Sequence, residues 1–184
     1  MKNSPDPKPK AKPEKTLILL RKSVFETPLG SMVVIADEHG LYLLEFEDAR
    51  KLDQRIEKLS AISTLIPGTT AATRSIKKEL NEYFKGQRKV FETPIFPNGT
   101  IFQKKVWNQL RKIPYGQTCS YLDLAKAVGK PRAFRAAASA NGANSFPIVI
   151  PCHRVINSNG ALGGYSSGLE RKKWLLALEK MMMI

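Results

Sequence analysis

The apolar pattern of this chain changes character about halfway along, and that change limits the fold more than any other feature. Three short runs rich in β-branched and aromatic residues come first, at 17–25, 32–36 and 41–46. Turn sequences containing Pro, Gly and Asp separate them, which is typical of strands in one sheet. Amphipathic helices are then expected at 49–59 and 71–84. We therefore predict that residues 16–93 form a small α+β domain built on an antiparallel sheet.

Residues 94–99 contain Pro, Asn and Gly and are expected to be a linker. Residues 100–184 are predicted to be mainly helical, with helices at 101–112, 121–128 and 131–140. Gly129 ends the second of these, and Pro131 suits the first turn of the third, where its missing N–H is not needed. Two short helices joined so tightly are typical of a helix-turn-helix. The expected fold class is α+β, with a winged helix-turn-helix-like DNA-binding motif in the second domain.

The positive charge is concentrated in this second part of the chain. Residues 1–15 are rich in Pro and Lys, carry a net charge of +3 and are expected to be a disordered basic tail. Residues 16–99 carry +1 and residues 100–184 carry +10, out of +14 in total. Such a field favours a polyanion such as DNA, although lysine-rich surfaces also serve solubility alone.

Neither a membrane nor export is indicated by the sequence. No apolar run approaches the roughly 20 residues that span a bilayer, and the N-terminus lacks the apolar stretch of a signal peptide. Two cysteines without an export signal favour a reducing compartment, so a cytoplasmic protein is expected. Residues 1–99 hold no cysteine and one histidine, so no four-ligand zinc site can be built there, and no cofactor or metal is predicted.

A cysteine followed by a histidine, Cys152-His153, comes directly after the apolar run 148–150. A thiol reacts as its thiolate, and a neighbouring histidine is able to remove the proton at neutral pH. The same pair also fits a cysteine hydrolase, and many buried cysteines are inert. A hydrolase would leave the basic second domain and Arg135 unexplained.

The string Pro151-Cys152-His153-Arg154-Val155 resembles the active-site motif of the O6-alkylguanine-DNA alkyltransferases (methylated-DNA–protein-cysteine methyltransferases). Other segments resemble the same family, in the same order and with similar spacing, at 102–107, 113–116, 120–121, 135–144, 163–166 and 174–176. The N-terminal strands, with 27–30, resemble its less distinctive first domain. The resemblance implies direct repair of O6-alkylguanine, and of O4-alkylthymine, by irreversible transfer of the alkyl group to Cys152. It also implies that the nucleotide is flipped out of the duplex and that each molecule acts once.

The resemblance assigns the catalytic roles to four residues. Cys152 is the nucleophile, and His153 removes its proton through a water molecule. Glu179 orients that histidine, following the logic of a Ser-His-Asp triad. Tyr121 crowds the 3′ phosphate and donates a proton to guanine N3.

The remaining roles concern DNA contact and the substrate pocket. The family places its recognition helix in the minor groove, where Arg135 takes the place of the flipped base. The other DNA-contacting residues implied are Tyr121, Ala136, Arg132 and Ser120. The substrate pocket is implied to be formed by Pro147, Val155, Tyr165 and Ser166, with Asn144 as the hinge that ties the recognition helix to the active site.

Several positions depart from the usual family pattern. Ala137 and Ala138 stand where Val-Gly is common in the recognition helix, and Ser145 stands where proline often follows the hinge asparagine. Ser167 replaces a frequent glycine in the pocket loop, which predicts an altered tolerance of bulky adducts. None of these changes removes a reactive group.

Two DNA-binding alternatives remain beside repair. Alkyltransferase-like damage sensors keep the fold but lack the reactive cysteine, which is present here. A helix-turn-helix regulator would need an effector or dimerisation domain, and none is evident. The expected partner is double-stranded DNA with alkylated bases, bound by a monomer in the cytoplasm, or in the nucleus of a eukaryote. Cooperative binding along DNA stays open.

Overall fold

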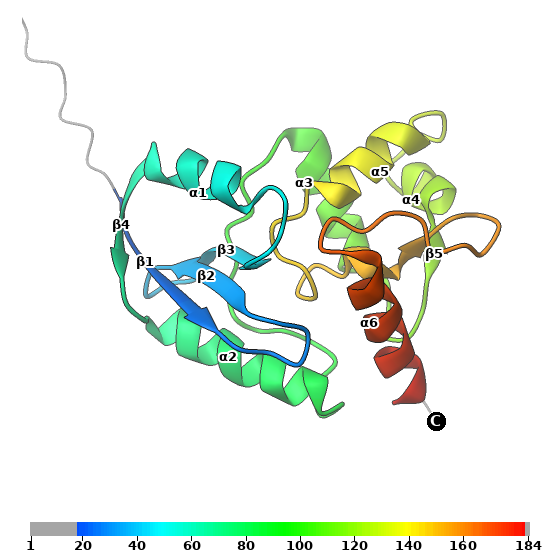
Figure 1. The fold of residues 1–184 in the computed structure, drawn as a ribbon. Helices are drawn as coiled ribbons and strands as arrows, with labels where there is room; N and C mark the ends of the chain where they lie inside the picture. The colour runs from blue at the N-terminus through cyan, green and yellow to red at the C-terminus, as the bar shows by residue number, and fades with distance from the viewer. Residues whose placement is uncertain (1–17, 183–184) are drawn as a thin grey trace, which may run out of the picture.

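The structure, a computed structural model, describes residues 18–182, so the predicted basic tail lies outside the described residues. A sheet with two flanking helices comes first, and a mainly helical half follows it (Figure 1). The α+β class is thereby confirmed. The strands of the first half are β1 (Ile18–Phe25), β2 (Met32–Ala36), β3 (Leu41–Phe46) and β4 (Ser63–Pro67), and its helices are α1 (Leu52–Ser60) and α2 (Ala71–Phe84).

The sheet has the strand order β3-β2-β1-β4. The pairs β1–β2 and β2–β3 are antiparallel, as expected, whereas β4 runs parallel to β1. The sequence reading predicted no strand at β4. Five residues that end in Pro67 show too little alternation to stand out, and pairing with β1 decides their conformation.

Alternate residues of the central strands face the two helices. Met32, Val34 and Phe46 pack in the same cluster as Ile76 and Leu80 of α2. Val33, Ile35 and Leu43 pack in a second cluster with Leu52 and Leu59 of α1. Because side chains alternate across a strand, the sheet buries both of its faces. Figure 1 shows α1 and α2 on opposite sides of it.

The second half contains four helices, α3 (Ile101–Leu110), α4 (Tyr121–Ala127), α5 (Phe134–Gly142) and α6 (Leu169–Met181). A short parallel pair, β5 (Cys119–Ser120) and β6 (Val155–Ile156), and the one-turn 3₁₀ helix η1 (Cys152–Arg154) complete it. Across residues 18–182, no helix has both the length and the apolar character needed to cross a bilayer.

The expected start of α5 at Pro131 is wrong. The Ala133 N–H donates to the Lys130 carbonyl at 2.8 Å, which closes a separate turn, and the helix begins at Phe134. Gly129, at φ 73°, ends α4 as predicted. Pro131 therefore lies in the turn between α4 and α5 rather than in α5.

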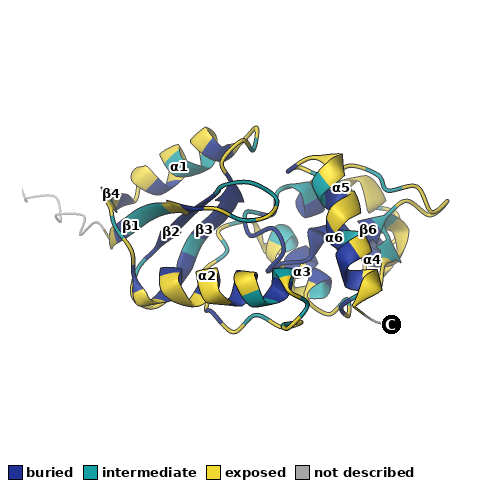
Figure 2. Cartoon of the chain, turned by 60° about the horizontal axis from the view of Figure 1, so that its bottom comes forward, coloured by how far each residue is buried: buried dark blue, intermediate teal, exposed yellow. Residues whose placement is uncertain are grey.

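One apolar cluster continues from the sheet into the helical half. It includes Ile76 and Leu80 of α2, Trp107 of α3, Leu175 of α6, and Ile150, which precedes η1. Figure 2 shows buried positions on the facing sides of both halves. The residues that surround Cys152 belong to this shared core, so the two halves jointly position the site.

Candidate active site

The segment before Cys152 is held in an unusual backbone conformation. Ile148 has φ 73°, in the left-handed region that β-branched residues rarely adopt. The Ile150 N–H bonds the Phe146 carbonyl at 2.9 Å, and the Cys152 N–H bonds the Ile150 carbonyl at 2.7 Å. This sharp turn directs the chain into η1. Backbone strain of this kind persists where surrounding structure fixes it, and it is frequent at functional sites.

Cys152 is buried, with 1% of its surface exposed, and it contacts the predicted hinge residue Asn144. Asn144 Nδ2 donates to Cys152 Sγ at 3.1 Å and to the Ile150 carbonyl at 2.9 Å. Asn144 Oδ1 accepts from the Phe146 N–H at 2.9 Å, so the amide cannot rotate freely. The structure therefore brings the hinge asparagine and the candidate nucleophile together.

Burial raises the pKa of the Cys152 thiol to about 11. The hydrogen bond from Asn144 and the charge of Lys172 lower this pKa, and the charge of Glu45 raises it. At neutral pH the resting site therefore holds a thiol, and its proton must leave when the sulfur attacks.

Behind Cys152 lie His153 and Glu179, both fully buried. His153 Nε2 lies 2.9 Å from Glu179 Oε1. Because an ionised carboxylate only accepts hydrogen bonds, Nε2 carries the proton and Nδ1 has a free lone pair. Nδ1 has no hydrogen-bond partner among the described residues. Burial, foremost, lowers the pKa of His153, so the ring is neutral and able to accept a proton.

Glu179 has four further hydrogen bonds, which the sequence reading did not identify. Arg154 Nη2 donates to Oε1 and Nε to Oε2, both at 2.9 Å. Tyr83 Oη donates to Oε1 at 2.7 Å, and the Gly116 N–H donates to Oε2 at 2.9 Å. Burial opposes ionisation of Glu179, but the bonds from His153 and Arg154 outweigh it and lower its pKa well below the ordinary value. The carboxylate is thus fixed and charged.

Lys172 is a second group that the sequence reading missed. Its ammonium is buried and donates to the carbonyls of Val155 at 2.5 Å, Gly164 at 3.2 Å and Leu162. Burial lowers the pKa of Lys172 to about 8. These hydrogen bonds from Lys172 of α6 connect β6 to the loop 157–166, which borders the pocket. A signal existed in the sequence, because Lys172 and Glu179 fall on the apolar face of α6 with Leu175 and Leu178.

A pocket of about 530 Å³ opens in front of Cys152, between α4, α5 and the loop 157–166. Tyr121, Arg135, Tyr165 and Ser166 line it, together with Cys152 itself. Tyr121 Oη donates to the Gly164 carbonyl at 3.2 Å, which places the phenol at the pocket edge. A nucleophile at the floor of such a pocket is suited to react with a group that enters the pocket past α5.

Not every residue predicted for the pocket lines it. Pro147 and Val155 are buried and do not line it, and Asn144 is connected to it only through its hydrogen bond to Cys152 Sγ. Sequence resemblance indicates which residues gather near a nucleophile, but it does not distinguish residues that line the pocket from buried residues that support them.

The predicted DNA-contacting residues lie on α4 and α5, in the turn between them and at the N-cap of α4. Arg135, Ala136 and Arg132 are exposed, and the Arg135 guanidinium lies 5.6 Å from the Phe134 ring centroid. Ser120 is the N-cap of α4, where its hydroxyl accepts from the Asp123 N–H at 3.0 Å and donates to the Asp123 carboxylate at 2.6 Å. The helix start therefore already uses the Ser120 hydroxyl.

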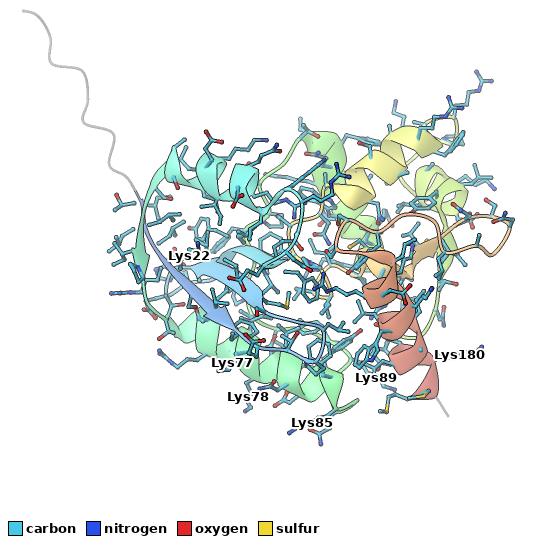
Figure 3. The ribbon with its side chains drawn as sticks, in the orientation of Figure 1. Lys22, Lys77, Lys78, Lys85, Lys89 and Lys180 are labelled. Carbon is cyan, nitrogen blue, oxygen red and sulfur yellow. The ribbon has the colours of Figure 1, made fainter. Side chains whose placement is uncertain are left out.

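Basic side chains are not confined to that surface. In Figure 3 Lys77, Lys78 and Lys85 of α2 and Lys180 of α6 lie along the lower side of the molecule, away from α5. Net charge alone therefore does not identify the DNA-facing side.

Two family models match nearly the whole of the described chain. The model for the 6-O-methylguanine DNA methyltransferase DNA binding domain matches residues 101–181, and that for the ribonuclease-like domain of the same proteins matches residues 20–97. A methylated-DNA–protein-cysteine methyltransferase of Methanosarcina acetivorans is 41% identical over 157 residues, which cover 85% of this chain and 96% of that relative.

Solved structures of O6-methylguanine methyltransferases are also similar to this chain. The crystal structure of Mycobacterium tuberculosis O6-methylguanine methyltransferase has a TM-score of 0.77 and 35% identity, and the match covers 89% of this chain and 94% of that one. Mycobacterium tuberculosis OGT in complex with DNA has a TM-score of 0.76 and 34% identity, with 90% and 94% covered.

Proposed function

This chain belongs to the 6-O-methylguanine DNA methyltransferase family, and we propose that Cys152 is the residue to which it transfers the alkyl group. The activity of the family is that of a methylated-DNA–protein-cysteine methyltransferase, which repairs DNA by moving an alkyl group to a protein cysteine. The observation that carries the assignment is the position of Cys152. It lies at the floor of the pocket beneath α5 and is hydrogen-bonded to Asn144.

The proposed reaction is one in-line displacement. The thiol proton passes to His153 Nδ1 through a water molecule, and Glu179 stabilises the resulting imidazolium. The sulfur forms a bond to the alkyl carbon as the bond from that carbon to guanine O6 breaks. The electron pair leaves with the guanine, and a proton from Tyr121 to N3 neutralises it. The product thioether is not readily hydrolysed, so each molecule acts once.

The substrate reaches the pocket by nucleotide flipping. An O6-alkyl group inside a duplex is inaccessible to a buried sulfur, and extruding the nucleotide costs a few kcal/mol. We propose that Arg135 occupies the gap in the base stack, a role supported by its exposure on α5 and its position at the same pocket. We propose O4-alkylthymine as a second substrate, because its alkyl group is likewise attached to an exocyclic oxygen. The proposed unit on duplex DNA is a monomer, in the compartment that holds the genome.

The test is the mass of the protein after mixing with a duplex that contains one O6-methylguanine. A single added methyl on the Cys152 peptide, saturating at one per protein, is expected. The Cys152→Ala variant should bind the same duplex without any mass change. The Cys119→Ala variant, the matched control, should still gain one methyl. Binding of the wild-type protein without transfer would instead support the damage-sensor alternative.

A parallel duplex with O4-methylthymine tests the second substrate. Transfer to the same cysteine is expected, and its absence would restrict the proposal to guanine.

A further inference from the structure

Glu45 is a buried carboxylate that the reaction proposed above does not use. It lies in β3 between Leu44 and Phe46 and is fully buried. Its Oε1 accepts from the Phe46 N–H at 3.0 Å and from Ser167 Oγ at 3.1 Å. Its Oε2 forms an ion pair with Arg55 of α1. Burial, foremost, raises the pKa of Glu45, and Arg55 opposes that change. A charge in so apolar a strand needs its partners.

Arg55 extends from this ion pair to the hinge before the active site. Its Nη2 donates to the Ala143 carbonyl at 3.3 Å, at the C-terminal cap of α5. Next to Glu45 in β3, the Leu44 N–H donates to the Ser145 carbonyl at 3.1 Å. The first domain therefore holds the residues on both sides of Asn144, which in turn contacts Cys152 Sγ.

Glu45 holds the opposite wall of the pocket through Ser167. Tyr165 and Ser166, which precede Ser167, line the pocket in front of Cys152. Behind them lies a second cavity of about 370 Å³, bordered by Glu45 and Arg55 among others. On the side of this cavity, the hydrogen bond from Ser167 to Glu45 limits the movement of the wall.

We propose that Glu45 and Arg55 form a positioning pair for the transfer reaction. Arg55 fixes the hinge that presents Asn144 to Cys152, Glu45 fixes the pocket wall at Ser167, and their mutual neutralisation prevents an uncompensated carboxylate from facing the nucleophile. This inference rests on the proposed function and adds the first domain to the working parts of the site.

The charges around the thiol give the pair a distinctive effect. Glu45 on β3 raises the pKa of Cys152, and Lys172 on α6 lowers it. The other titratable groups near the sulfur are His153 on η1, Tyr121 on α4 and Tyr165 in the loop. Changing one member of the pair therefore alters the net charge near the thiol, with opposite signs for the two members.

The experiment measures the single-turnover rate of methyl transfer at saturating protein from about pH 7 to about pH 11, so that the range reaches the pKa of about 11 to which burial raises the Cys152 thiol. Arg55→Met leaves the carboxylate alone and should move the midpoint of the pH profile upward by about half a unit or more. Glu45→Gln should move it downward. The double variant carries neither charge, and its midpoint should lie between those of the two single variants.

Two control variants separate this effect from general damage. Asp48→Asn breaks another ion pair between the halves, in which Arg171 donates at 2.8 Å to an exposed carboxylate, and it should leave the pH profile unchanged. Arg55→Lys keeps the charge but shortens the reach to Ala143. It should slow transfer with the midpoint unmoved.

Equal slowing by Arg55→Met, Glu45→Gln and the double variant, with a fixed midpoint, would reduce the pair to a structural contact and overturn the proposal. Wild-type rates in both single variants would overturn it as well. If the wild-type protein itself gains no methyl, the proposed function fails first, so the two failures are distinguishable. The midpoint in Glu45→Gln, a near-isosteric change, decides the outcome should Arg55→Met not fold.

Discussion

The two sides of Cys152 are built in opposite ways. Behind it, a carboxylate that accepts five hydrogen bonds holds a neutral histidine, and all of these groups are buried or nearly so. In front of it, α4 and α5 present exposed side chains around an open pocket. The rear side is fixed by folding alone, whereas under the proposed function the front side is completed by bound DNA. Substitutions behind the sulfur should therefore affect stability and chemistry together, and substitutions in front should affect only the reaction with duplex.

The largest expected effect comes from Glu179→Gln. The change leaves Arg154 buried beside a neutral amide, so the free energy of unfolding should fall by about 3–5 kcal/mol, and transfer should be lost. Urea denaturation and the mass assay measure the two effects. Glu170→Gln on the same helix, at an exposed position, is the control and should change stability by less than about 0.5 kcal/mol. A stable but inactive Glu179→Gln protein would contradict the idea that the hydrogen bonds of Glu179 serve both stability and transfer.

On the front side, Arg135→Ala should slow transfer from duplex roughly 30- to 100-fold, since flipping costs a few kcal/mol. Stability should stay within about 0.5 kcal/mol of wild type, because the side chain is exposed. Transfer from a single strand, where no base needs to be flipped, should be nearly unaffected. The control Arg132→Ala, outside α5, should have a smaller effect on duplex. Equal slowing on both substrates would remove Arg135 from the flipping step.

A smaller effect is expected from Tyr83→Phe, which removes one hydrogen bond from Glu179 and little volume. Loss of a bond to a charged group should lower the free energy of unfolding by about 1.5 kcal/mol or more, and transfer should slow several-fold. Tyr115→Phe is the matched control, since the Tyr115 ring packs 6.0 Å from that of Tyr83 and its buried hydroxyl has no partner among the described residues. Identical results for the two variants would show that the bond to Glu179 contributes nothing.

The smallest effect is a pH dependence of stability. Burial lowers the pKa of His153 from its ordinary value of 6.5, so below pH 6.5 the unfolded chain binds a proton that the folded protein does not. Stability should therefore fall on acidification, by up to about 1.4 kcal/mol per pH unit. The Glu179 carboxylate, whose pKa is also lowered, adds to the loss below its ordinary 4.5. Denaturation curves at several pH values should show a flatter slope for His153→Gln and an unchanged one for His39→Gln, an exposed turn residue.

Sequence reasoning identified the groups that stand close together in the chain or in a known motif. Cys152 and His153 are adjacent, and their resemblance to a family motif led to Glu179, Asn144 and Tyr121, which the structure places around the pocket or behind it. The strands 32–36 and 41–46 and helix 71–84 were predicted at the bounds observed. Local pattern and turn chemistry suffice for such elements.

The missed groups act across the two halves. Tyr83 and Glu179 are 96 positions apart, and Glu45 and Ser167 are 122 apart, so no periodicity connects them. A weaker signal was present, because Glu45 interrupts an apolar strand and Lys172 interrupts an apolar helix face. A charge at a core position indicates that a partner exists. Only tertiary packing shows which residue it is.

The same sequence separations have a consequence for how the protein is made. Contacts between such distant residues form late, because a long loop must first be closed. During synthesis the N-terminal domain emerges and folds first, so Glu45 and Tyr83 take their places before α6 supplies Glu179. Until α6 docks, the site lacks both Glu179 and Lys172. The last helix to be synthesised is therefore the one that completes the site.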